Sequence, residues 1–103
     1  MPDPEVDIAR NLKSIEWLKT EMLSGVSSLY RGMYRNSDEQ ITEALAHTVI
    51  AAYILGKRLG IGFPRLDAKI QQMVKANVDE GHEIEEWYGD FSSLLKYLQN
   101  HKR

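Results

Sequence analysis

Acidic and imidazole side chains recur at every fourth position near the middle of this 103-residue sequence. Glu39, Glu43 and His47 have this spacing, which places them on one face of a helix. Glu21 lies in an earlier segment with a helical apolar pattern. Carboxylates and an imidazole on neighbouring helices can hold a divalent ion, which neutralises phosphate charge and activates water. We therefore take Glu21, Glu43 and His47 as candidate metal ligands.

Simpler interpretations of the same residues stay open. Acidic residues favour the start of a helix because they interact with its dipole, so Glu39 and Glu43 also fit a solvated helix face. His47 stands between Ala46 and Thr48, a setting that also suits a hydrogen-bonded histidine beside a helical core. The spacing alone does not separate a metal site from an ordinary polar face.

Two arginines lie close to the end of the same early segment. Arg31 and Arg35 can approach the phosphates of a ligand, and they are equally ordinary partners of a helix dipole. Both interpretations of these cations stay open.

Helices are the elements that must position these residues. Apolar residues recur at intervals of three and four between sparse glycines and prolines. We predict a first helix from about Pro4 to Tyr34, with Asp3 as its cap and with Gly25 and Gly32 as local weak points. Its apolar stripe comprises Ile8, Leu12, Ile15, Met22, Val26, Leu29 and Met33.

A second long helix is predicted over residues 38–59. The segment from Ser37 to Gln40 fits a capping box, in which Ser37 accepts a backbone N–H and Gln40 reaches back. The helix ends at Gly60, a residue type common just after a helix. Its predicted buried residues are Ile41, Leu45, Thr48, Val49, Ala52, Leu55 and Leu59.

Shorter helices are predicted in the rest of the chain. A third helix follows the corner at residues 62–64 and reaches about Asn77, residues 83–88 form a helical turn or two, and Asp90 caps a last helix. Two long helices joined by a short turn lie antiparallel, so the predicted fold is an all-α bundle of four to five helices. Residues 1–103 fit one domain, and a second copy of the chain would cover any apolar patch that its modest core leaves.

Composition excludes several classes of function. Thirteen Lys and Arg against 15 Asp and Glu leave a net charge of -2, which provides no basic field for nucleic acid. The chain has no Cys, which excludes disulfides and thiolate chemistry. The most apolar stretch, residues 44–55, is far shorter than the roughly 20 residues that span a bilayer. The acidic start does not fit a secretion signal, so we expect a cytoplasmic protein without nucleic-acid or membrane partners.

Segments spread over most of the chain carry a family resemblance. They are Asn11–Lys19, Glu21–Ser24, Thr42–His47, Val49–Ile61 and His82–Asp90. In these segments the chain resembles the MazG-like family, and specifically its short single-domain members. That family belongs to the all-α nucleotide pyrophosphohydrolase superfamily.

The resemblance implies a four-helix fold assembled as a homodimer or higher homo-oligomer. It also implies hydrolysis of a nucleoside triphosphate to the monophosphate and pyrophosphate, with Mg²⁺ or Mn²⁺ as cofactor if the protein is active. Lys75 and Asn77 match the family's Lys and Asn near the end of the third helix. The resemblance implies that they bind the phosphate or base of a nucleotide.

The chain departs from the family's metal motif, which is Glu-x-x-Glu on the first helix and Glu-x-x-Asp on the second. Glu21 matches the first position, but Ser24, Ala44 and His47 stand at the other three. Magnesium needs hard oxygen ligands, so this loss is expected to abolish ordinary catalysis. Two functions stay open: a relative of the pyrophosphohydrolases with a degenerate metal site, or a non-catalytic helical module that binds a nucleotide or a protein.

Overall fold

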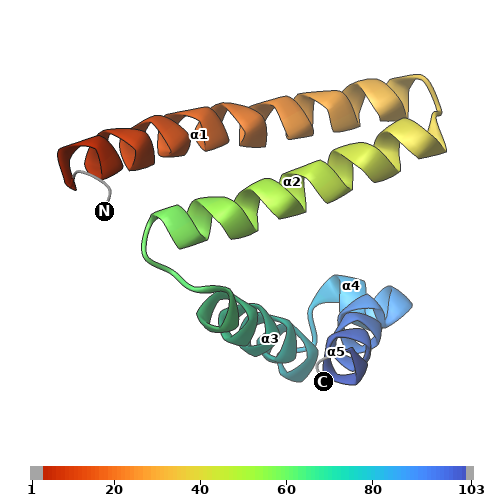
Figure 1. Cartoon of the computed structure of the whole chain (residues 1–103). Helices are drawn as coiled ribbons and strands as arrows, with labels where there is room; N and C mark the ends of the chain where they lie inside the picture. Colours follow the sequence, from red (N-terminus) through yellow and green to blue (C-terminus); the bar gives the residue numbers. More distant parts are fainter. Residues whose placement is uncertain (1–3, 102–103) are drawn as a thin grey trace. The chain divides into compact units, whose positions relative to one another are not determined.

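The computed structural model describes residues 4–101, and these residues form five helices and no strand (Figure 1). The predicted all-α fold class is confirmed, and the predicted helices agree closely in position with the observed ones. Asp3, the predicted cap of the first helix, lies outside the described residues. The helices are α1 (Pro4–Tyr34), α2 (Asp38–Arg58), α3 (Phe63–Asp79), α4 (Glu83–Tyr88) and α5 (Asp90–Asn100).

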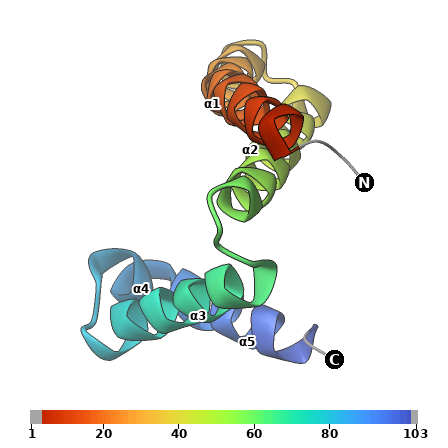
Figure 2. The ribbon, with the colours of Figure 1, turned by 60° about the vertical axis from the view of Figure 1, so that its left-hand side comes forward.

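The chain divides into two compact units, the first ending at Phe63 and the second beginning at Pro64. In the first unit, α1 and α2 pack along each other as an antiparallel hairpin (Figures 1 and 2). The second unit contains the remaining helices, of which α4 and α5 contact each other. The organisation of residues 1–103 as one domain stays a prediction. Within residues 4–101, no helix is both long and apolar enough to cross a membrane.

Small residues form the seam between α1 and α2. A methyl group at Gly25 would overlap Thr48 Oγ1 and would lie 3.4 Å from His47 Cδ2. A methyl group at Gly32 would lie 3.1 Å from the backbone nitrogen of Ile41. The two glycines that the sequence marks as weak points are therefore the places where α2 approaches most closely. The buried residues of the hairpin are Leu18, Gly25 and Gly32 of α1 and Ala44 and Ala51 of α2.

Half of the residues in the apolar stripes of the two long helices are exposed in a single chain and the other half are partly buried, so the burial predicted for α2 is only partial. Ile8, Leu12 and Met33 of α1 and Leu45 and Val49 of α2 are all exposed. The physical reason is the close approach of the backbones, which leaves little room for large side chains in the seam, where Leu18 is the one large buried residue of the described part of the hairpin. Larger side chains must therefore extend along its flank.

The turn between α1 and α2 confirms half of the predicted capping box. Ser37 Oγ accepts the backbone N–H of Gln40 at 3.2 Å, as expected for an N-cap. The side chain of Gln40 does not reach back, because its Nε2 donates to the carbonyl of Ser28 at 3.3 Å. The N–H of Ser37 donates instead to the carbonyl of Gly32 at 2.9 Å. These contacts tie the start of α2 to α1 and fix the register of the hairpin.

A carboxylate from α4 caps α5, where the sequence predicted Asp90 as the cap. Asp90 is the first residue of α5, and Gly89 occupies the cap position without a side-chain bond. Glu85 accepts the backbone N–H of Ser92 at 3.0 Å and also the Ser92 hydroxyl. Gly89 permits this return because its φ of 68° is left-handed, where glycine is unstrained.

Candidate functional site

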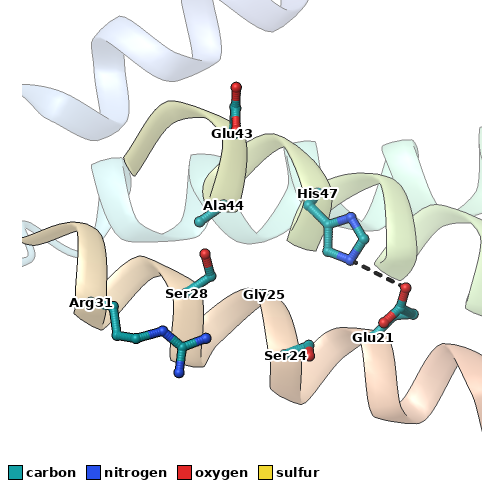
Figure 3. Close-up of a pocket in the computed structure, with 8 residues that line it drawn as sticks. All are labelled: Glu21, Ser24, Gly25, Ser28, Arg31, Glu43, Ala44 and His47. Carbon is teal, nitrogen blue, oxygen red and sulfur yellow. Dashed lines mark ion pairs between the residues drawn. The ribbon is translucent and has the colours of Figure 1, made fainter. Parts of the chain in front are cut away.

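Polar side chains line a hollow of about 450 Å³ along one flank of the α1–α2 seam (Figure 3). The α1 residues of this lining are spaced by three and four, so they share one helix face. The hollow collects all three candidate metal ligands among its lining residues. The residues that line the hollow are Glu21, Ser24, Gly25, Ser28 and Arg31 of α1 and Glu43, Ala44 and His47 of α2.

Glu21 and His47 face each other across the hollow (Figure 3). The distance between Glu21 Oε1 and His47 Nε2 is 3.8 Å, and the two groups form an ion pair when the imidazole is protonated. Glu21 is the more enclosed of the two, with 24% of its side chain exposed against 46% for His47. The sequence placed these residues on separate helices, and the register of the hairpin makes them partners.

Glu43 lines the hollow but does not join this pair. Its carboxylate is directed away from α1, whereas His47 and Glu21 point toward each other (Figure 3). Across residues 4–101, no three His, Cys, Asp or Glu side chains are grouped so that they could hold a metal ion. The metal site of Glu21, Glu43 and His47 stays a prediction, of which the structure brings two members together.

The donor groups of the hollow do not fit magnesium, which prefers an octahedral set of oxygen ligands. Ala44 is 3% exposed and packs against α1, so its position supplies no ligand. Ser24 supplies a hydroxyl, and Glu21 supplies a carboxylate that faces an imidazole. One carboxylate beside one imidazole is closer to the preferences of manganese or zinc.

Arg31 lines the hollow on the side away from the Glu21–His47 pair (Figure 3). Its Nη1 donates to Ser27 Oγ at 3.0 Å, and within residues 4–101 it has no carboxylate partner. A guanidinium carries five N–H donors, so several remain for an anion. Arg31 also lies in the last turn of α1, where a cation interacts favourably with the helix dipole, so both interpretations stay open.

The polar surface continues toward the turn between the helices. A second hollow of about 480 Å³ shares Ser28 and Glu43 with the first and also includes Glu39. Ser28 was missed as a site residue in the sequence. The signal that would have found it is its spacing of seven residues from Glu21, which puts both on one helix face.

Lys75 and Asn77, the predicted nucleotide ligands, lie on α3 in the second unit. Lys75 Nζ is 4.0 Å from Asp79 Oδ2, and Asn77 Nδ2 donates to the carbonyl of Met73 at 3.0 Å. Both interactions are local to α3. The role of these two residues in binding a nucleotide stays a prediction.

Comparison with known proteins supports the resemblance seen in the sequence. The sequence profile of the MazG-like family matches residues 8–91, which include most of α1, all of α2, α3 and α4, and the start of α5. No curated protein and no protein of solved structure matches the chain.

Proposed function

This chain belongs to the MazG-like family, and from that premise we propose that it is a non-catalytic relative of the nucleoside triphosphate pyrophosphohydrolases. In this proposal the α1–α2 hollow binds a nucleotide without magnesium-dependent hydrolysis. The observation that carries the proposal is the Glu21–His47 contact of 3.8 Å, where the family motif implies a set of metal-binding carboxylates. The proposal includes a cytoplasmic location, where nucleotides are abundant.

The size and lining of the hollow support a small anionic ligand. Its volume of about 450 Å³ falls within the roughly 300 to 1,000 Å³ typical of small-molecule sites. Arg31 would bind a phosphate, because guanidinium–phosphate hydrogen bonds are charge-assisted and can be bidentate. The hydroxyls of Ser24 and Ser28 would donate to the same phosphate or to the sugar.

Glu21 and His47 would act as a pair in this site. A lone carboxylate would repel a phosphate, and the neighbouring imidazole would offset that repulsion when it is protonated. The free lone pairs of Glu21 would accept hydrogen bonds from a sugar hydroxyl or an exocyclic amine. The pair would therefore orient the ligand without activating water.

Binding and hydrolysis can be measured separately. We expect no pyrophosphate release from any of the four common ribonucleoside triphosphates with magnesium. Calorimetric titration with a non-hydrolysable triphosphate in EDTA should show binding that Arg31→Gln weakens about tenfold or more, the worth of a charge-assisted hydrogen bond. Arg10→Gln is the matched control, because Arg10 lies far along the same helix and does not line the hollow.

Glu21→Gln separates this function from a metal-dependent one. Removing a negative charge beside the phosphate should tighten metal-free binding by a few-fold. If Glu21 instead holds a metal, the same variant weakens metal-supported binding. Magnesium-dependent pyrophosphate release that Glu21→Gln abolishes would contradict the proposal.

The Glu21–His47 contact also favours one second candidate, which is hydrolysis with manganese. In this alternative Glu21 and His47 bind the ion, Glu43 turns inward as a third ligand, and Lys75 or Asn77 contacts the nucleotide. Its signature is pyrophosphate release with manganese but not with magnesium, lost in Glu21→Ala and in His47→Ala.

A further inference from the structure

The first half of α1 carries a basic and aromatic surface outside the α1–α2 hollow. A separate open hollow of about 370 Å³ is lined there by Arg10, Lys13, Ser14 and Trp17. Their spacing of three and four residues places all four side chains on one face of the helix. None of them lines the α1–α2 hollow described above. We call these four residues the basic–aromatic face.

Both cations of the basic–aromatic face are free to bind an anion. Among residues 4–101, no Asp or Glu lies within ion-pair distance of Arg10 or Lys13. Lys19 on the same helix is different, because its Nζ lies 3.2 Å from Glu16 Oε1. Like charges one helical turn apart repel each other, and an anion placed between them removes that repulsion. A carboxylate-rich partner therefore matches this part of α1.

Trp17 adds a large apolar group and a further donor to this face. It is 59% exposed, whereas its neighbour Leu18 is 3% exposed and packs into the hairpin. An indole N–H, a guanidinium and an ammonium group only donate hydrogen bonds. The Ser14 hydroxyl already donates to the carbonyl of Arg10 at 2.8 Å. A complementary partner must therefore supply acceptors together with an apolar group.

The shape of the basic–aromatic face indicates a protein segment as its occupant. All of its lining residues come from one helix, so the hollow has no opposite wall. A small-molecule site commonly buries about 70 to 90% of its ligand, which one helix face does not do. A lipid surface requires a broad apolar face beside the cations, whereas Trp17 is the one apolar residue of these four. A protein segment brings its own wall, and Trp and Arg contribute strongly to protein interfaces.

We propose that the basic–aromatic face binds an acidic segment of another protein. Carboxylates of that segment pair with Arg10 and Lys13, and an apolar side chain packs on Trp17. Lys13 precedes Trp17 by one turn, a rise of about 6 Å along the axis. Acidic and apolar residues three or four positions apart on a partner helix have a rise of roughly 5 to 6 Å, which matches this distance. The inference does not depend on the nucleotide proposal.

Peptide selection tests the chemistry of the partner without knowing its identity. A displayed library of random short peptides is selected on the full chain, after removal of sequences that also bind the double variant Arg10→Gln/Lys13→Gln. The selected peptides should combine Asp or Glu with a large apolar residue. Affinity of the best one should fall about tenfold or more in the double variant, because charge-assisted hydrogen bonds are lost. Lys19→Gln is the matched control, since it removes the same charge from the same helix and should leave affinity unchanged. An empty selection, or selected peptides without acidic residues, would overturn the proposal.

Trp17 fluorescence shows where the selected peptide binds. The chain has two Trp, so Trp87→Phe leaves Trp17 as the sole tryptophan. A tryptophan-free form of the peptide should shift its emission to shorter wavelength, because an apolar side chain displaces water from the indole. The same peptide with Gln and Asn in place of Glu and Asp should give no shift. If phosphatidylserine vesicles, ATP or a higher concentration of the protein alone give the shift and the acidic peptide does not, the occupant is a lipid, a nucleotide or a second copy, and the proposal is wrong.

Discussion

Glycine at two positions of α1 determines how closely the long helices approach. A glycine inside a helix costs roughly 0.5 to 1 kcal/mol relative to alanine, so its presence needs a compensating contact. At Gly25 that contact is Thr48, whose hydroxyl donates to the carbonyl of Ala44 at 2.8 Å and occupies the space of a methyl group. The close approach in turn brings Glu21 within 3.8 Å of His47.

Gly25→Ala should therefore destabilise the protein despite the better helix propensity of alanine. Overpacking a seam costs typically 1 to 3 kcal/mol, which exceeds the propensity gain and leaves a net loss of about 1 to 2 kcal/mol. Urea unfolding followed by circular dichroism measures this loss. Ser24→Ala, an exposed neighbour that gains the same propensity without a clash, should be neutral or slightly stabilising.

The cause can be isolated by removing the opposing atom. In a Thr48→Ala background the overlapping Oγ1 is gone, so Gly25→Ala should become neutral or stabilising there. A double-mutant cycle should then give a coupling energy of about 1 kcal/mol or more. Simple additivity of the two substitutions would show that Thr48 does not limit the approach.

Part of the candidate site could be predicted from residue types and spacing alone. Glu21, Glu43 and His47 all line the hollow, because residues four apart stay on one helix face. The sequence could not show that Glu21 pairs with His47 while Glu43 turns away. That difference depends on the register between the helices, which Gln40 and Ser37 fix through contacts to α1.

At the scale of the elements, the positions of glycines and prolines and the apolar periodicity predicted helix bounds close to the observed ones. The same periodicity did not predict which apolar residues the hairpin itself buries, because an apolar stripe indicates only that a face avoids water. The stripe does not indicate whether the residues that pack against it belong to the same chain or to another. Leu18 and Ala51, which are buried, were absent from the predicted stripes, whereas Leu12 and Val49 were in them and are exposed.

The junction of α4 and α5 depends on a carboxylate that acts across helices. Glu85 binds the N-terminal turn of α5 through Ser92, in place of the side-chain cap that Gly89 does not have. Capping rules consider only the residues next to the start of a helix, so the sequence did not predict the contact between Glu85 and Ser92. The α4–α5 segment therefore has one polar tie that a single substitution can cut.

Glu85→Ala should lower the free energy of opening the first turn of α5 by about 1 kcal/mol, because an N-cap contact typically contributes that much. Hydrogen exchange of the amides in the first turn of α5 is the direct measurement, and their protection should fall about fivefold. Glu83→Ala on the same short helix is the control, since Glu83 is exposed and has no contact with Ser92. Equal effects of the two substitutions would mean that Glu85 stabilises α4 rather than α5.

For the molecule as a whole, the hairpin gives its two flanks different chemistry. One flank carries charged and hydroxyl groups around a hollow, and the other carries exposed aliphatic side chains such as Leu12, Leu45 and Val49. Assembly through the apolar flank would stabilise the protein and leave the polar flank accessible to a ligand. A small chain with few buried residues gains much of its core in this way, because burial rises with the size of the folded assembly.

If the second copy completes the core, thermal stability must depend on protein concentration. Unfolding of a dimer releases two chains, so mass action raises Tm as concentration rises. With an unfolding enthalpy of about 0.7 kcal/mol per residue, a hundredfold increase in concentration should raise Tm by roughly 5 to 8 °C. Leu45→Asp should both lower Tm and remove this dependence, whereas Gly25→Ala should lower Tm and keep it. A wild-type Tm that stays constant over that range would mean that no second copy covers the exposed aliphatic side chains of the hairpin, and that the hairpin is stable with them in water.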